Sequence, residues 1–119
     1  MLAPIAAATA YRHRIALAVA QGGAIPQAAY LAFGSGDRAY SPDTDTELQA
    51  EFLRVACTTA VDGVRLTVIG VLKGSAAGLN VTREVAVFAA DGTLMGRRVV
   101  AAKELEPETE ITFELVFEY

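Results

Sequence analysis

The sequence has very few of the side chains that usually carry chemistry. Its 119 residues include one histidine, His13, one cysteine, Cys57, and no tryptophan. A single cysteine cannot form a disulfide within the chain, and one histidine with one cysteine cannot supply the ligands of a zinc site. The long separation between them disfavours a Cys/His nucleophile pair. We therefore expect Cys57, within a strand-like run at 52–59, to be buried and unreactive.

Motifs for phosphate and calcium binding are missing as well. Gly34-Ser35-Gly36 resembles a glycine-rich loop, but neither a Gly-Lys-Ser/Thr ending nor a suitable helix follows it. Asp43, Asp45 and Glu47 alternate as calcium ligands sometimes do. An EF-hand loop starting at Asp43 would need Gly at its sixth position and Glu at its twelfth, and this chain has neither there. We interpret the stretch as a turn leading into a short helical turn at 46–51.

Catalytic motifs are also absent from the sequence. It contains no nucleophile elbow and no dinucleotide-binding fingerprint. Three glutamates, Glu104, Glu106 and Glu108, could offer a carboxylate pair, but they surround Pro107 and are typical of a solvated loop. We predict that the protein is not an enzyme and that it uses no cofactor and no metal ion.

Excess positive charge and long apolar runs are lacking too. Ten Lys and Arg against fourteen Asp and Glu give a net charge of −4, which disfavours nucleic acid and anionic membranes as partners. No apolar run reaches the roughly 18 residues that cross a bilayer. Arg12 and Arg14 lie inside the apolar N-terminal stretch rather than before it, which is the wrong order for a signal peptide. We expect a soluble chain that is not exported.

What is present indicates one ordered domain. Apolar residues make up 53% of the chain, which is the composition of a globular protein rather than a disordered one. A chain of this length can bury roughly two thirds of its unfolded surface. We predict a single domain over residues 1–119, with an N-terminal helical region at 1–23 and a β-rich body at 24–119.

A helix is predicted over residues 5–21. Pro4 suits the first helical position, and Gly22-Gly23 ends the helix. Arg12 and Arg14 fall on other faces than the apolar residues, and they form either a solvated rim or a docking contact to an acidic neighbour. The apolar positions that recur at three- and four-residue steps are Ala8, Tyr11, Ile15, Ala18 and Val19.

A hairpin is the strongest local signal in the sequence. Two apolar runs, at 84–89 and 93–101, flank Asp91-Gly92. Asp-Gly between such runs favours a type I′ turn, which needs a positive φ at both central residues. An isolated hairpin is marginal in water, so further strands are required beside it.

Other segments are predicted to supply those strands. Alternation is clearest at 110–119, which has one apolar, partly aromatic face and one mostly acidic face. A second Asp-Gly turn lies at 62–63, and residues 73–78 read as a flexible connection. The helix followed by about six strands predicts an α+β fold with a mainly antiparallel sheet or small sandwich. The remaining strand candidates are 25–33, 51–59 and 64–72.

In this order, the pieces resemble the N-terminal, baseplate-docking domain of phage tail-collar and tail-fibre proteins. The residues that carry the resemblance begin with Arg83–Leu94, which is similar to the family's hairpin of acidic residue, Val, Phe and Asp-Gly. Ala32–Asp37 matches a strand that closes in a Gly-x-Gly turn, and Leu48–Arg54 matches a Leu/Glu/Phe/Arg stretch. The ending, Lys103–Tyr119, is similar to a loop followed by a long alternating strand.

The resemblance implies a structural protein without catalytic residues. Family members continue into a shaft and a receptor-binding tip, which have no counterpart here, so only the docking or adaptor function is implied. Its partners would be other tail, baseplate or fibre proteins and further copies of itself, in the virion tail after assembly in the host cytoplasm. Contacts are expected from the helix, the 34–45 loop and the terminal strand. The candidate residues are Tyr11, Arg12, Arg14, Asp37, Arg38, Tyr40, Glu114, Glu118 and Tyr119.

A second class of function is a stand-alone β-rich domain that binds a glycan or a peptide. Glycan sites favour exposed aromatic side chains, and this sequence has no tryptophan. Most of its other aromatic residues fall at alternating positions typical of a core. The structural hypothesis is therefore preferred.

Overall fold

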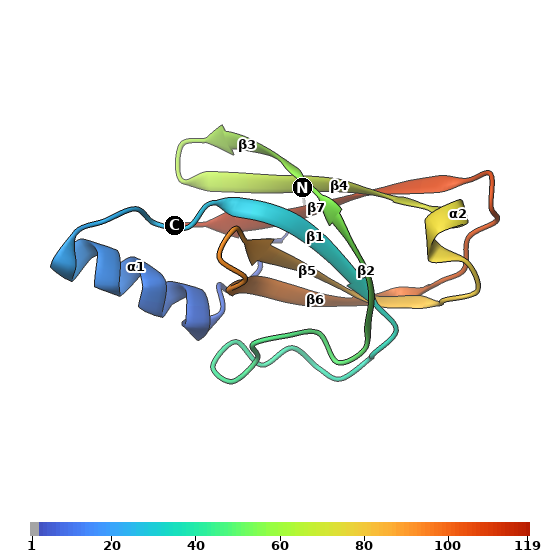
Figure 1. Ribbon diagram of the computed structural model, residues 1–119, viewed down its shortest axis with the longest axis horizontal. Coiled ribbons are helices and arrows are strands. Elements are labelled where there is room, and N and C mark those ends of the chain that lie inside the picture. Colours follow the sequence, from blue (N-terminus) through green and yellow to red (C-terminus); the bar gives the residue numbers. More distant parts are fainter. Residues whose placement is uncertain (1–2) are drawn as a thin grey trace.

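Two β-sheets face each other, and a helix extends from one end of them (Figure 1). The computed structural model describes residues 3–119, so Met1 and Leu2 of the predicted N-terminal region lie outside the described part. Sheet A has the strand order β2-β1-β5-β6, and sheet B has the order β3-β4-β7. The elements are α1 (Thr9–Gln21), β1 (Ala28–Gly34), β2 (Glu51–Ala56), β3 (Thr58–Asp62), β4 (Arg65–Lys73), α2 (Gly74–Ala77), β5 (Thr82–Ala89), β6 (Leu94–Lys103) and β7 (Glu110–Glu118).

The predicted α+β class is confirmed, with seven strands instead of about six. The extra strand arises because the predicted strand at 51–59 is two strands that lie in different sheets. The chain leaves sheet A after β2 and enters sheet B at β3, passing through Cys57. No Gly or Pro marks this switch, so the sequence shows one continuous strand.

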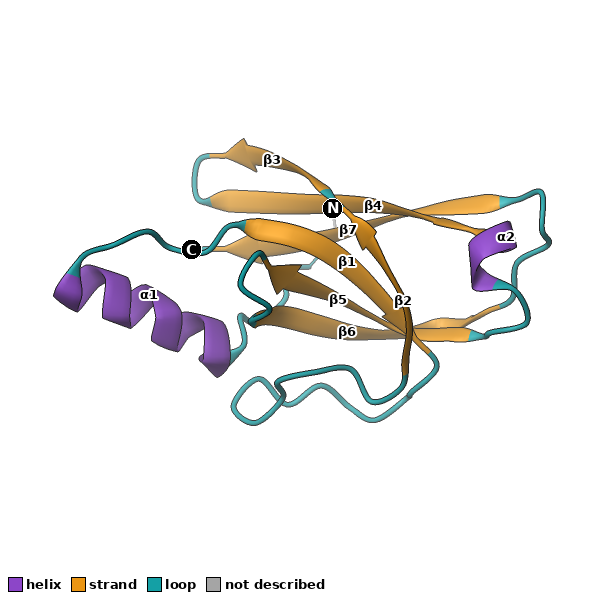
Figure 2. Ribbon diagram, in the orientation of Figure 1, coloured by secondary structure: helices purple, strands orange, loops and turns teal. Residues whose placement is uncertain are grey.

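This switch makes the two sides of the sandwich different. On one side, the continuous chain from β2 to β3 connects the sheets (Figure 2). On the opposite side, β6 and β7 are the outermost strands of their sheets, and no strand among residues 3–119 joins them.

The core lies between the sheets. Strand alternation directs Leu31 and Phe33 of β1 towards Phe113 of β7, and the two phenyl rings lie 5.3 Å apart at a tilt of 54°. Burial of each such side chain contributes about 1.5–3 kcal/mol. Further buried members of the same cluster are Val68, Leu72, Val85, Val87, Leu115 and Phe117.

The predicted hairpin is formed by β5 and β6, but the predicted type I′ turn is wrong. Only glycines have a positive φ within residues 3–119; Gly92 has φ +90°, whereas Asp91 does not. The N–H of Gly92 donates to the carbonyl of Ala89 at 2.9 Å. This is a type I turn followed by a glycine bulge. Asp91 stays at negative φ while its carboxylate accepts the N–H of Thr93 at 3.0 Å.

The helix begins at Thr9, four residues later than predicted. Residues 3–8 are extended instead, because their backbone bonds to both sheets. The N–H of Ile5 donates to the carbonyl of Val116 in β7, at 2.7 Å. The N–H of Ala8 donates to the carbonyl of Met95 in β6, at 2.8 Å. The segment thus fills the first part of the gap between the two edge strands.

Three smaller predictions are corrected. The first strand starts at Ala28 rather than at residue 25, and the connection at 73–78 contains the short helix α2. The helical turn predicted at 46–51 does not form. Its backbone N–H groups at Gln49 and Ala50 donate to the carboxylate of Glu84 instead.

Candidate assembly surfaces

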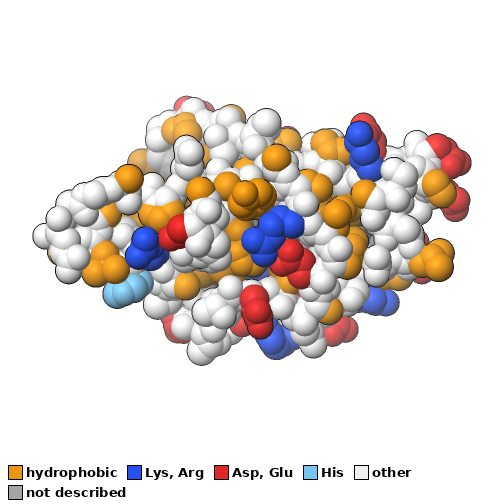
Figure 3. Space-filling model, in the orientation of Figure 1, with side chains coloured by type: hydrophobic (Ala, Val, Ile, Leu, Met, Phe, Trp, Pro, Cys, Tyr) orange, Lys and Arg blue, Asp and Glu red, His pale blue; other side chains and the backbone are white. Residues whose placement is uncertain are grey.

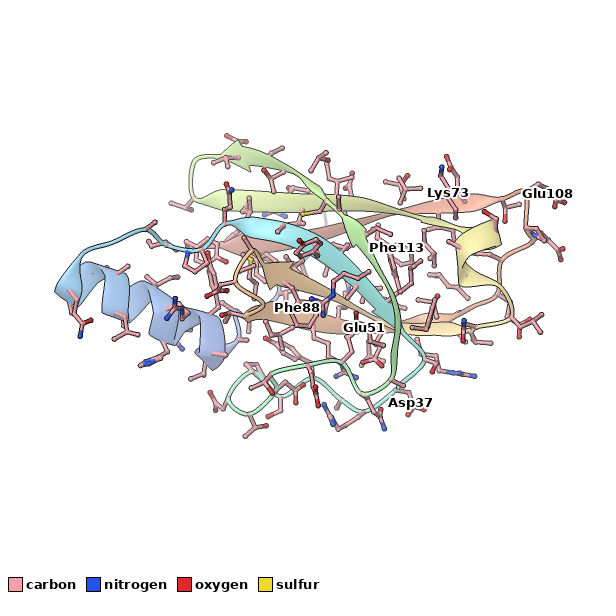
Figure 4. The ribbon with its side chains drawn as sticks, viewed as in Figure 1. Asp37, Glu51, Lys73, Phe88, Glu108 and Phe113 are labelled. Atoms are coloured by element: carbon pink, nitrogen blue, oxygen red, sulfur yellow. The ribbon has the colours of Figure 1, made fainter. Side chains whose placement is uncertain are left out.

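The long loop at 35–50 covers the outer face of sheet A. Small and apolar side chains of the sheet, Ala32, Ala86 and Phe88, form a second buried cluster with Leu48 of the loop. Figure 4 shows Phe88 on the loop side of sheet A, whereas Phe113 lies between the sheets. The loop is therefore fixed in part by apolar contacts.

A buried carboxylate fixes the loop further. Glu84 of β5 is completely buried, and its oxygens accept the N–H groups of Gly36, Gln49 and Ala50 at 2.8–2.9 Å. The Nε of Arg97 in β6 donates to the same carboxylate at 2.8 Å. One side chain thus holds both ends of the loop. Burial raises the pKa of Glu84, but these four hydrogen bonds outweigh burial, so its pKa lies below the usual value.

Arg97 connects Glu84 to the middle of the loop. Its Nη1 lies 3.6 Å from Oδ2 of Asp45, and both side chains are buried. Asp45 also accepts the backbone N–H of Ser41 at 3.1 Å and a hydrogen bond from the Arg38 guanidinium at 3.2 Å. Asp45 is therefore part of an ion-pair network that anchors the loop.

Some of the loop residues predicted as contacts anchor the loop, and others are exposed on the surface. Arg38 is half-exposed and bonds to Asp45, whereas Asp37 is exposed at the lower edge of the molecule (Figure 4). Tyr40 donates its hydroxyl to the carbonyl of Ala6 at 2.7 Å. Burial and the nearby charge of Asp45 raise the pKa of Tyr40 to about 12. Tyr40 therefore ties the loop to the N-terminal segment.

Of the helix residues predicted as contacts, one anchors the helix and the others are exposed. Tyr11 is only 5% exposed, and its hydroxyl donates to the carbonyl of Pro26 at 2.7 Å, so it anchors α1 and is not available on the surface. Arg14 is exposed and pairs with Asp91 of the β5–β6 turn at 3.1 Å. Arg12 is also exposed. Most of α1 faces solvent, including Val19, whose exposed fraction is 79%.

The terminal-strand residues Glu114, Glu118 and Tyr119 are all exposed. Glu118 pairs with Arg65 of β4 at 2.8 Å. The ring of Tyr119 stacks on Phe117, with 6.2 Å between centroids and 15° between planes. Tyr119 is half-exposed, and its partial burial raises its pKa.

A groove of about 580 Å³ brings residues from all three predicted contact segments together. Arg12 and Ile15 of α1 form one wall, and Glu118 and Tyr119 form the other. Pro42 of the loop lies at the same groove. Of the nine candidate residues, Arg12, Glu118 and Tyr119 line this groove, whereas the other six do not: Tyr11, Arg14, Asp37, Arg38, Tyr40 and Glu114.

A second cleft, of about 570 Å³, lies in the gap between β6 and β7 beyond residues 3–8. We call it the β6–β7 seam. Its lining is largely apolar, with charged side chains among it. The apolar residues include Val85, Val100, Ile111, Phe113 and Leu115, and the charged ones are Arg98, Lys103 and Glu114.

Cys57 is half-buried where the chain switches sheets, so the prediction of a buried side chain is only partly right. Burial raises the pKa of its thiol, which keeps the thiolate fraction low at neutral pH. Across residues 3–119, no cluster of three or more His, Cys, Asp or Glu side chains has the arrangement of a metal site. The helices described in this range are all too short or too polar to span a membrane.

The sequence prediction missed the roles of Glu84 and Arg97. A signal for them is present: each is a charged residue next to an apolar run of its strand, and both lie on the same face of paired strands, with Arg97 opposite Ala86. Charges placed this way have to be paired. Comparison with known proteins adds no relative, since no family model, curated protein or solved structure matches the chain.

Proposed function

We propose that this protein is a structural subunit of a phage tail or a related contractile injection particle, acting as a docking or adaptor module. The observation that carries the proposal is the groove between α1 and the end of β7. It joins residues from all three segments in which the sequence leads us to expect contacts: α1, the loop at Pro42 and the end of β7.

Exposed apolar side chains at the same end of the molecule support this proposal. Val19 is 79% exposed, Ile25 is 47% exposed and Tyr119 is 50% exposed. Figure 3 shows hydrophobic side chains and the single histidine on the surface of α1. Burial of such side chains is worth roughly 25 cal/mol per Å² of apolar area, so a neighbouring subunit that covers them gains free energy.

Charge also suits a contact at this groove. Arg12 provides a positive group on one wall, and Glu118 provides a negative group on the other. A partner segment with both signs can pair with each wall, and such complementarity sets orientation more than affinity. The rigid anchoring of the loop by Glu84 and Arg97 keeps the neighbouring surface in one shape, which lowers the entropy lost on docking.

The alternative is a stand-alone domain that binds a peptide strand, and the β6–β7 seam favours it over a glycan-binding domain. An extended peptide can add to an exposed sheet edge through main-chain hydrogen bonds. The two hypotheses differ in which surface is used, since the docking module depends on α1 and the peptide-binding domain depends on the seam.

The experiment is co-purification of tagged protein with tail or injection particles from cells that produce both. We expect the wild-type protein to sediment with particles. Val19→Glu, which places a charge on the exposed side of α1, is expected to reduce incorporation at least tenfold. The matched control is Ala102→Glu on an exposed position of β6 away from α1. Wild-type protein that stays out of the particles, or Val19→Glu incorporated like Ala102→Glu, would contradict the proposal.

A further inference from the structure

Both edges of sheet B are open. Within residues 3–119, β3 pairs with β4 alone, and β7 pairs with β4 and, at one end, with the N-terminal segment. All five residues of β3 are exposed, and its one charge, Asp62, is at its end. An edge strand without proline, internal charge or a cover is a template for another strand.

The N-terminal segment forms hydrogen bonds with only part of the β7 edge that faces away from β4. The carbonyl of Val116 accepts the N–H of Ile5, so the backbone polar groups of Val116 point away from β4. Because backbone direction alternates along a strand, the polar groups of Glu114 and Thr112 point to that same edge. Residues 110–114 of β7 have no hydrogen-bonding partner on this edge within residues 3–119, and we call them the unmatched part of β7. They number five, as do the residues of β3.

The β6–β7 seam lies beside this unmatched part of β7. A strand added there must direct an apolar side chain towards Phe113 and Ile111. Val61 of β3 meets this requirement: it is 73% exposed and lies opposite Leu66, on the face of sheet B that points towards the core. Ala60 and Thr58 point to the other, solvent-facing side.

We infer that β3 of a second copy pairs with residues 110–114 of β7, so that sheet B continues from one copy to the next. Both strands are antiparallel to β4, so they run parallel to each other. Copies joined by translation therefore pair β3 and β7 in parallel and keep the core faces on one side. Because β3 lies opposite residues 65–69 of β4 and residues 110–114 lie opposite 69–73, the translation includes a shift of about four residues along the strands, which places Val61 over the seam.

Pairing of β7 with β7 of a second copy is disfavoured by charge. Two of the three residues on the solvent-facing side of the unmatched part are acidic, Glu110 and Glu114. A two-fold contact centred on Thr112 would place Glu110 beside Glu114 of the other copy, twice, and facing like charges destabilise a strand pair. The first four residues of β3 are uncharged, so the β3–β7 contact avoids this repulsion.

The contact is head-to-tail, so each added copy presents a new open edge. Such contacts close into a ring or continue as a filament. This inference goes beyond the proposed function, because self-association through β3 and β7 does not require a phage tail.

Disulfide trapping between two single-cysteine populations tests the contact. Both carry Cys57→Ser; one adds Ala60→Cys on β3, and the other adds Thr112→Cys on β7. These positions are the centres of the two five-residue stretches, and both side chains face solvent. We expect a covalent dimer on mild oxidation of the mixture, at least tenfold more abundant than in either population alone.

Other trapping patterns overturn the inference. A dimer of Ala60→Cys alone would mean that β3 pairs with β3, and a dimer of Thr112→Cys alone would mean that β7 pairs with β7. Absence of a dimer in all three samples would mean that the two edges do not meet in this register.

Sedimentation of untagged protein gives an independent test. We expect the weight-average mass of the wild type to rise with concentration above that of one chain. Val61→Lys is expected to abolish this rise, whereas the matched control Val61→Thr retains β propensity without a charge and reduces it only partly. Equal self-association of wild type and Val61→Lys, or a wild type that is monomeric throughout, would contradict the inference. Self-association without incorporation into particles would leave this inference standing and remove the proposed function.

Discussion

The outer faces of the two sheets differ in how far other segments of the chain cover them. The face of sheet A is covered by the loop at 35–50, and it buries a Glu84–Arg97 ion pair. On the outer face of sheet B, by contrast, Thr58 and Ala60 of β3 and Thr112 and Glu114 of β7 are exposed. Buried hydrogen bonds and ion pairs hold the outer surface of sheet A in one conformation. The exposed edge of sheet B, which carries little charge, is available for pairing with another chain.

The largest loss of stability is expected from removing Glu84, which anchors the loop on sheet A. Glu84→Ala leaves Arg97 buried without its carboxylate and leaves three backbone N–H groups without their acceptor. Removal of one partner of a buried pair costs about 3–5 kcal/mol. Urea denaturation should show this loss in the free energy of unfolding. Glu114→Ala on sheet B is the matched control, with an expected change within about 0.5 kcal/mol. Equal effects of the two variants would remove the distinction between the faces.

Acid should weaken sheet A through the same residue. The folded-state pKa of Glu84 lies below its usual value, so its contribution to stability is present above about pH 4.5 and is lost as the pH falls through the folded pKa. We expect the wild type to lose stability more steeply than Glu84→Gln between about pH 4.5 and pH 2. Thermal melting over this range measures both slopes. Parallel slopes would show that Glu84 is not the group responsible.

The fold could be predicted from the sequence wherever a local pattern decides the structure. The alternation in 110–119 and the Asp91-Gly92 turn predict β7 and the β5–β6 hairpin correctly, within one or two residues. The division of 51–59 between two sheets could not be predicted, because the side-chain pattern of an extended chain is the same on both sides of Cys57. Which sheet a strand joins is decided by long-range pairing.

The candidate site was only partly predictable for the same reason. The exposed groups on α1 and at the end of β7 follow from local polarity. Burial of Tyr11 and the loop-anchoring role of Glu84 depend on segments 15 to 48 positions away in the sequence. No window of local sequence contains both partners of such contacts. A charge within an apolar strand indicates only that a partner exists.

Each sheet contains one tight hairpin with a glycine at positive φ. Gly92 in the sheet A hairpin has φ +90°, and Gly63 in the sheet B hairpin has φ +61°; neither position is crowded. A β-branched residue resists positive φ, so Gly92→Val should cost at least ~1 kcal/mol in the free energy of unfolding. Gly92→Asn, which tolerates this φ, should cost less. A denaturation midpoint unchanged by Gly92→Val would contradict the turn geometry.

The smallest effect is expected on the bare face of sheet B. Glu118 pairs with Arg65 in solvent, and such pairs contribute about 0–1 kcal/mol. Glu118→Gln should therefore lower the free energy of unfolding by no more than about 0.5 kcal/mol, with a smaller effect in 1 M salt because ions screen exposed charges. Thermal melting at low and high salt measures it. A loss of unfolding free energy as large as that of Glu84→Ala would mean that this ion pair anchors sheet B as strongly as Glu84 anchors the loop on sheet A.

Cryo-electron microscopy of intact tail or injection particles, from cells that produce this protein, would show directly whether the chain is a subunit of the particle. We expect repeated copies of the chain around the particle axis, with a neighbouring subunit covering Val19 of α1 and the groove between α1 and Tyr119. Particles that are complete without this chain, together with native protein that remains monomeric in the same cells, would rule out a structural role in the particle.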